Sequence, residues 1–89
     1  MDQTHRVAII ILNWNGLALT TQCVTGLLKQ CVPADIYILD NGSANIESIK
    51  LLASFPQVRT ERSERNLGFT GGNNYWINRL QDRYDYLVL

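Results

Sequence analysis

The sequence predicts an α/β fold, a three-layer sandwich with a mainly parallel sheet between helices. Three apolar runs rich in β-branched residues, at 7–12, 36–39 and 86–89, have the pattern of strands that are buried on both faces. Between these runs, apolar residues recur with helical spacing. Strand-helix-strand units of this length form right-handed crossovers into a parallel sheet, so we expect the order β-α-β-α-β-α-β.

The first strand and the first helix have the clearest patterns. Residues 7–12 form the longest uninterrupted apolar run and predict the first strand. Pro33 ends the helix that follows, because proline cannot continue a helix. This helix has one apolar stripe at i, i+3, i+4 and i+7, formed by Val24, Leu27, Leu28 and Cys31.

The remaining elements continue this alternation. After the strand at 36–39, a second helix has Ser43 or Asn45 as its candidate N-cap and ends at Pro56. Its apolar residues are Ile46, Ile49, Leu52 and Ala53. Residues 58–62 alternate with charged side chains and predict an edge strand. A third helix before the last strand is marked by Trp76, Ile77, Leu80 and Tyr84.

The composition argues against several classes of function. With 46% hydrophobic and 18% charged residues, the 89 residues are typical of a globular chain with one core. Eight basic residues balance eight acidic ones, so no net charge attracts nucleic acid or an anionic membrane. No apolar run approaches the ~20 residues that cross a bilayer. We expect a cytoplasmic protein, or one at the cytoplasmic face of a membrane, with no membrane segment in this chain.

The cysteines predict neither a disulfide nor a metal site. Cys23 and Cys31 lie eight residues apart in one predicted helix, which separates them by roughly 12 Å, too far for a disulfide. Neither has a Cys or His neighbour at metal-binding spacing, and His5 is in the polar start of the chain. We expect buried free thiols without a catalytic role.

Parallel sheets bind ligands at the carboxyl ends of their strands, so the loops there are the candidate site. The first loop contains neither a dinucleotide-binding G-x-G-x-x-G motif nor a P-loop. Instead, Asn13, Trp14 and Asn15 offer amides and an aromatic face, which suit a planar heterocycle. The alternative is an ordinary turn in which Trp14 covers the core.

The second loop begins with Asp40, which follows an apolar strand directly and precedes Asn-Gly-Ser. A carboxylate at this position accepts an N–H of a base or a ribose hydroxyl, and we expect it to contribute little to folding. The alternative is that Asp40 caps the next helix.

The third loop includes residues 66–74, NLGFTGGNN. Gly71 and Gly72 allow the backbone to approach a ligand, and a helix that begins there directs its first N–H groups at a diphosphate or a sugar hydroxyl. Asn73 and Asn74 add neutral hydrogen bonds. The alternatives are a glycine-rich connector with an Asn cap and, for the nearby Arg65, a solvated charged run.

Four segments in order carry a resemblance to a known family: VAIIILNWNG, DIYILDNGSAN, ERNLGFTGGNNYWINR and DYLVL. Together they resemble the start of a nucleotide-diphospho-sugar glycosyltransferase of inverting family two, in its rhamnosyltransferase-like branch. The resemblance implies a GT-A fold with sheet order 3-2-1-4. Residues 1–89 are then the nucleotide-binding part of a single domain that is truncated at its C-terminal end.

The resemblance also implies roles for individual residues. Asn13, Trp14 and Asn15 line the base and ribose, and Asp40 accepts from the imide N–H of uracil or thymine. The other implied nucleotide-sugar contacts are Gly42, Arg65, Asn66, Gly71, Gly72 and Asn73.

The implied substrates are a UDP- or dTDP-sugar and a saccharide or lipid-linked acceptor. The family's divalent metal, Mg or Mn, has its ligands in a segment expected beyond Leu89, as does the catalytic base. No catalytic or metal-binding residue is therefore expected in this chain, and the chain alone is expected to be inactive. The apolar last strand also predicts self-association.

A second hypothesis is a small flavodoxin-like or receiver-like module that binds a nucleotide or a protein without transferase chemistry. A phosphoacceptor receiver needs clustered acids after its first strand and an Asp at the end of its third. Here the first strand ends in Asn-Trp-Asn and the third in a mixed charged run, which disfavours this hypothesis.

Overall fold

The computed structural model describes residues 6–30 and 33–89, so the predictions for His5 and Cys31 lie outside the described residues. Strands and helices alternate along the chain in the predicted order, which is confirmed. The elements are β1 (Val7–Asn13), α1 (Leu17–Lys29), β2 (Asp35–Asn41), α2 (Ser48–Ser54), β3 (Arg59–Ser63), α3 (Gly68–Leu80) and β4 (Tyr86–Val88).

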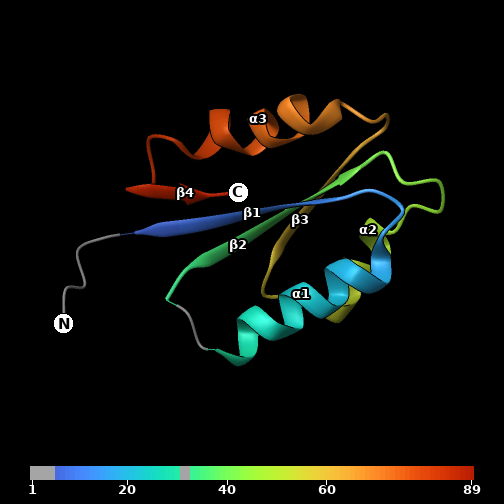
Figure 1. The fold of residues 1–89 in the computed structure, drawn as a ribbon, viewed down its shortest axis with the longest axis horizontal. Helices are drawn as coiled ribbons and strands as arrows, with labels where there is room; N and C mark the ends of the chain where they lie inside the picture. Colours follow the sequence, from blue (N-terminus) through green and yellow to red (C-terminus); the bar gives the residue numbers. More distant parts are fainter. Residues whose placement is uncertain (1–5, 31–32) are drawn as a thin grey trace.

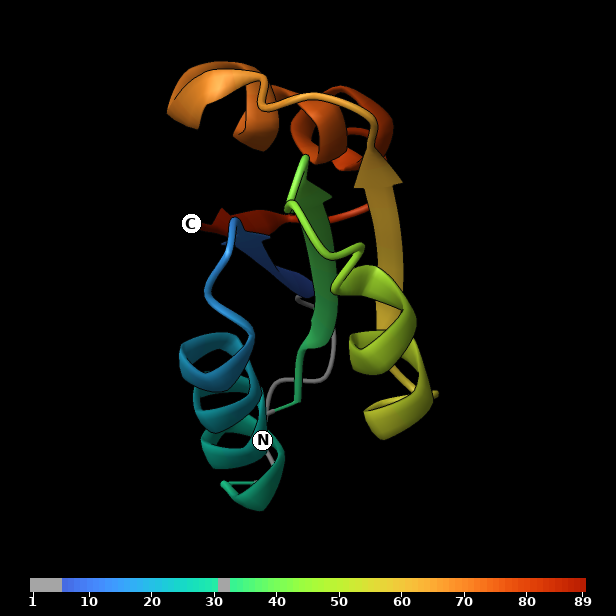
Figure 2. The same ribbon diagram turned by 90° about the vertical axis from the view of Figure 1, so that its right-hand side faces the viewer.

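The strands form one parallel sheet in the order β3-β2-β1-β4 (Figure 1). Helices α1 and α2 cover one face of this sheet and α3 covers the other, so the molecule has three layers (Figure 2). The strand order reverses direction at β1, which pairs with both β2 and β4. Because the crossovers are right-handed, this reversal places α1 and α3 on opposite faces. The predicted α/β class, layers and strand order are confirmed.

The core has two halves because alternate residues of β1 and β2 face opposite layers. On the α3 side, the buried residues are Ala8, Ile10, Tyr37, Leu39, Trp76, Leu80 and Tyr84. On the α1 and α2 side, they are Val24, Ile36, Ile38, Leu51, Phe55 and Val58. Both faces of these strands are covered, which explains why their sequences are apolar without alternation.

The predicted apolar stripe of the second helix is wrong. Its members are all exposed: Ile46, Ile49, Leu52 and Ala53. The helix begins only at Ser48, after Glu47 at the N-cap, because Ile46 has a left-handed backbone with φ of 48°. Helix α2 therefore turns Leu51 toward the sheet, and Phe55, the C-cap residue one turn later, packs in the same half of the core.

The prediction of a buried thiol is wrong for Cys23, which is free and exposed. Its neighbour Val24 is fully buried against the sheet, and consecutive helical residues point about 100° apart. Cys23 therefore lies at the side of α1, where it borders a groove of about 540 Å³.

This groove runs along the open edge of β1 beyond the end of β4. Strand β4 pairs with β1 only as far as Ile9 opposite Val88. Leu27 of α1 and Phe69 of α3 line the groove together with the end of β4. Val88 and Leu89 are exposed there, and no charged side chain lines the groove among the described residues.

No helix in the described part of the chain has the length and apolar character to span a membrane.

A chain of hydrogen bonds joins β2 to the segment between α3 and β4 near the amino end of the sheet. The hydroxyls of Tyr37 and Tyr84 lie 2.6 Å apart, and the Tyr84 hydroxyl also donates to the Asp35 carboxylate. Burial, together with hydrogen bonds to Asp35 and Tyr37, raises the pKa of Tyr84 above its ordinary value of 10.0. These contacts fasten the segment between α3 and β4 to β2.

Candidate functional site

The candidate site lies at the carboxyl edge of the sheet, where the loops after β1, β2 and β3 meet. The strand register places Asn13 opposite Asp40, and Asp40 opposite Arg62. Parallel pairing therefore brings together side chains from the ends of three strands that are more than 20 residues apart in the sequence. Such an edge is where open α/β sheets bind ligands.

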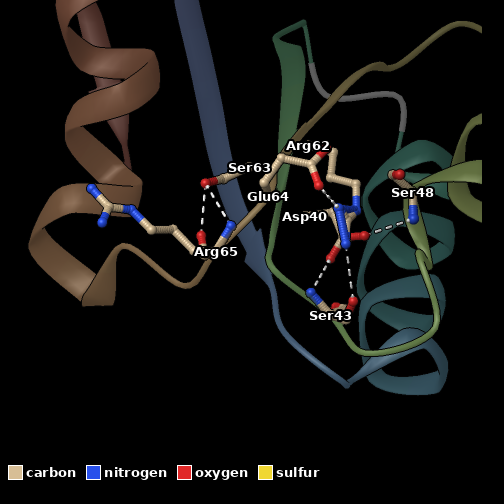
Figure 3. Close-up of polar contacts among 7 residues, drawn as sticks. All are labelled: Asp40, Ser43, Ser48, Arg62, Ser63, Glu64 and Arg65. Carbon is tan, nitrogen blue, oxygen red and sulfur yellow. Dashed lines mark hydrogen bonds and ion pairs between the residues drawn. The ribbon is translucent and has the colours of Figure 1, made fainter.

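Asp40 is fully buried, with 0% of its surface exposed. One carboxylate oxygen, Oδ1, accepts hydrogen bonds from the Ser43 backbone N–H at 3.3 Å and from Asn13 Nδ2 at 3.4 Å. The other, Oδ2, accepts from the N–H of Ser48, the first residue of α2, at 2.8 Å (Figure 3). Asp40 thus caps α2, and the expectation of an open carboxylate is wrong. Its burial and its hydrogen bonds now lead us to expect a contribution to folding.

Asn13 is buried beside Asp40, with 1% exposure. Its Nδ2 lies within hydrogen-bond distance of Ser43 Oγ at 3.3 Å and Glu47 Oε1 at 3.0 Å as well as Asp40. Its Oδ1 accepts from the Thr20 hydroxyl of α1 at 2.7 Å. Asn13, Thr20, Asp40 and Ser43 form a buried polar network that joins β1, α1, β2 and the loop before α2.

The loop after β1 projects from this network. Asn15 has a left-handed backbone with φ of 49°, and its N–H donates to Ser43 Oγ at 2.9 Å. Its side-chain Oδ1 accepts from the Ala44 N–H at 2.8 Å. Trp14 is 56% exposed, so the alternative that it covers the core is wrong. The turn is fixed at its base and presents an aromatic ring to solvent.

Gly42 joins the second loop to the third. It has φ of +81°, and a Cβ there would lie 2.6 Å from the Arg65 carbonyl carbon and from the Asn66 nitrogen. Residues other than glycine rarely adopt this backbone conformation, and the space leaves no room for a Cβ. The close backbone approach at Gly42 is therefore to another loop of the protein.

Asn41 holds the start of α3 against β2, a role that the sequence reasoning missed. Its Oδ1 accepts from the Leu67 N–H at 2.9 Å, and its Nδ2 donates to the Gly68 carbonyl at 3.2 Å. The Nδ2 also donates to Asn66 Oδ1 at 3.3 Å. A Cβ at Gly72 would lie 2.9 Å from Asn41 Nδ2. Gly72 is thus needed where α3 meets β2. The only sequence signal for the role of Asn41 was the Asn-Gly pair that follows an apolar strand.

Residues 71–73 lie inside α3, which begins three residues earlier than expected, at Gly68. Gly71 is half-buried in this helix, and Asn73 is buried with its Nδ2 donating to the Phe69 carbonyl at 3.1 Å. The expectation of a loop over the nucleotide formed by Gly71, Gly72 and Asn73 is therefore wrong. The exposed first turn of the helix is formed by Gly68, Phe69 and Thr70.

The charged run at 61–65, which begins inside β3, contains a half-buried and an exposed arginine. Arg62 donates from Nη2 to the Ser43 carbonyl at 3.3 Å, while its Nε is buried without a hydrogen-bond partner. Its Nη1 lies 3.5 Å from the Glu64 carboxylate. Arg65 is exposed and points away from Asp40 (Figure 3). The sequence reasoning named Arg65 and missed Arg62, whose placement depends on pairing with β2.

We use the name carboxyl rim for the predicted site residues that are exposed: Trp14, Asn15, Arg65 and Asn66. The contacts of Ser43 with Asn15 and of Gly42 with Asn66 connect the two sides of this rim through the second loop. Together with the first turn of α3, the rim offers an aromatic face, amide groups, a guanidinium and the backbone N–H groups of Phe69 and Thr70, while the Gly68 N–H already donates to Asn66 Oδ1 at 2.6 Å.

The described residues contain no group of three or more His, Cys, Asp and Glu side chains that could hold a metal ion. The divalent metal implied by the resemblance therefore has no ligand set in this part of the chain.

No protein-family model, curated protein or solved structure matches the sequence. These comparisons identify no family, and the interpretation of the site depends on its geometry and on the sequence motifs.

Proposed function

We propose that the carboxyl rim binds the nucleotide of a UDP- or dTDP-sugar, and that this chain is the nucleotide-binding part of an inverting glycosyltransferase. The observation that supports the proposal is the connected rim at the ends of three parallel strands. It combines an exposed Trp14 on the first loop with Arg65 and the exposed start of α3 on the third. These are groups that suit the two ends of a nucleoside diphosphate.

Each part of the rim has a chemical role in this proposal. The ring of Trp14 stacks on the base, and the amides of Asn15 and Asn66 bind ribose or sugar hydroxyls. The diphosphate lies at the first turn of α3, where backbone N–H groups and the helix dipole favour an anion, with Arg65 as its counter-charge. Transfer of the sugar to a saccharide or lipid-linked acceptor requires a base, and none is assigned among the described residues.

Calorimetric titration with UDP and dTDP tests the proposal. Arg65→Ala should weaken UDP binding by roughly 10- to 150-fold, because one hydrogen bond to a charged group is lost. The matched control is Arg59→Ala, which removes an exposed arginine at the other end of β3. The control should leave the affinity unchanged. Equal losses in both variants, or no saturable binding by the unaltered chain, would contradict the proposal.

The same titration separates the second hypothesis, a binding module without transfer chemistry. A receiver-like module requires clustered acids after β1 and an Asp at the end of β3, whereas β1 ends in Asn13 and β3 in Ser63. Binding of UDP-sugar at least as tight as UDP favours the transferase proposal, because the site then accommodates the sugar. Rejection of the sugar conjugate favours a plain nucleotide-binding module.

A further inference from the structure

We propose that Asp40 and Ser43 are positioning residues of this site: they fix the Trp14 ring at the rim, and the base is bound by the ring face without contact to Asp40. This inference rests on the proposed function in assuming that a nucleotide is the ligand. If it holds, the site should discriminate only weakly between pyrimidine bases, because stacking depends little on the groups at the edge of the base.

The first step of the argument is the closure of Asp40. Both of its oxygens already accept hydrogen bonds from backbone N–H groups, those of Ser43 and Ser48, and the residue has no exposed surface. A base N–H would reach the carboxylate only by displacing one of these bonds. Displacement at Ser48 would uncap α2, and displacement at Ser43 would release the second loop.

The second step is the connection from Asp40 to Trp14. Asp40 holds the Ser43 N–H, and Ser43 Oγ in turn accepts from the Asn15 N–H at 2.9 Å. Asn15 is bound a second time through Ala44, which keeps its left-handed backbone in place. Trp14 lies between Asn15 and the buried Asn13, so both of its neighbours are anchored in the same network.

The third step is a consequence for base selection. If Asp40 accepted from the imide N–H of uracil, as the resemblance implies, it would distinguish uracil from cytosine, whose N3 carries no proton. With Asp40 closed, this distinction is lost, and UDP and CDP should bind within about threefold of each other. Loss of the Asp40 carboxylate should then lower both affinities by the same factor, because it disturbs the ring and not the recognition of the base.

The experiment follows the fluorescence of Trp14 as the only tryptophan, excited selectively over the tyrosines. The chain has two tryptophans, and Trp76→Phe removes the other one. Trp76 Nε1 is buried without a hydrogen-bond partner, so phenylalanine loses no bond there. In this background we compare Asp40→Asn and Ser43→Ala with the control Asp35→Asn. Asp35 lies at the far end of β2 and its carboxylate also accepts a side-chain hydrogen bond.

Without nucleotide, Asp40→Asn and Ser43→Ala should each change the emission maximum and anisotropy of Trp14, whereas Asp35→Asn should not. With nucleotide, Asp40→Asn should weaken UDP and CDP equally, by roughly tenfold, and leave their ratio unchanged. Asp35→Asn should leave both affinities unchanged below its melting transition.

Two results would overturn the inference. A UDP-to-CDP ratio that shifts tenfold or more in Asp40→Asn would show that Asp40 contacts the base. Unchanged Trp14 emission in folded Asp40→Asn and Ser43→Ala would show that the network does not position the ring. If Asp40→Asn does not fold, Ser43→Ala decides alone. If the unaltered chain binds neither nucleotide, the proposed function fails, while the emission comparison still decides whether Asp40 and Ser43 position Trp14.

Discussion

Replacing Gly72 by alanine tests how closely α3 must approach the sheet. The added Cβ would lie 2.9 Å from Asn41 Nδ2, closer than Cβ atoms approach other atoms in folded proteins, and 3.0 Å from Leu12 Cδ1, which is tighter than most contacts of a Cβ. Asn41 cannot simply move aside, because the same Nδ2 donates to Asn66 and Gly68. We therefore expect Gly72→Ala to destabilise the fold and to loosen the start of α3.

The magnitude follows from opposing contributions. Alanine in a helix interior is favoured over glycine by about 1 kcal/mol. Overpacking against Leu12 costs roughly 1–3 kcal/mol, and a buried Asn41 amide that loses its partners costs about 1–3 kcal/mol. The net expectation is a loss of about 1–5 kcal/mol, with the middle of the range at about 3 kcal/mol. For a domain of this size, a loss of about 3 kcal/mol lowers the melting temperature by roughly 12–24 °C.

Urea unfolding followed by circular dichroism measures this loss. Gly26→Ala is the matched control, because Gly26 lies inside α1 and a Cβ there meets no atom within 4 Å. The control should be more stable than the unaltered chain by up to about 1 kcal/mol, from helix propensity alone. If Gly72→Ala were stabilised as much as Gly26→Ala, the close packing of α3 against Asn41 would be refuted.

Three further predictions concern other parts of the fold. Because the pKa of Tyr84 is raised above 10.0, the contribution of Tyr84 to the free energy of unfolding should be fully present below about pH 10 and fall as the pH rises further. Urea unfolding at several pH values should show a smaller alkaline loss in Tyr84→Phe, and an identical loss would contradict this origin. Gly42→Ala should destabilise by about 2 kcal/mol or more, because it combines a left-handed backbone with a clash, and an unchanged urea midpoint would rule that out. Sedimentation should show concentration-dependent association through the uncharged β4 edge and less of it in Val88→Lys, whereas a monomer at all concentrations would argue against an adhesive edge.

The sheet could be predicted because its strands carry their own signal. Residues 7–12 and 36–39 are apolar on both faces only if helices cover both faces, and this also predicts the layers. The start of α3 could not be predicted in the same way. Its Gly-Gly-Asn-Asn segment has poor helix propensity. This segment is helical because Asn41 of β2 holds Leu67 and Gly68, where the helix begins.

The candidate site was predicted by location but not by accessibility. Its residues do lie at the carboxyl edge, since that follows from parallel strands. Whether Asp40 faces a ligand or the protein depends on bonds with Asn13 and Ser48, and no local pattern distinguishes these outcomes. The same holds for α2, where a left-handed Ile46 delays the helix and turns a different face toward the core.

The most direct test of nucleotide binding at the rim is an NMR titration of the isotopically labelled chain with UDP. The proposal predicts saturable shifts of the Trp14 indole N–H, the Asn15 side-chain amide and the backbone N–H groups of residues 68–70. Signals of Asp35 and Tyr84, at the amino end of the sheet, should stay in place. An absence of shifts at millimolar UDP, or shifts confined to the groove beside Val88, would contradict the proposed site.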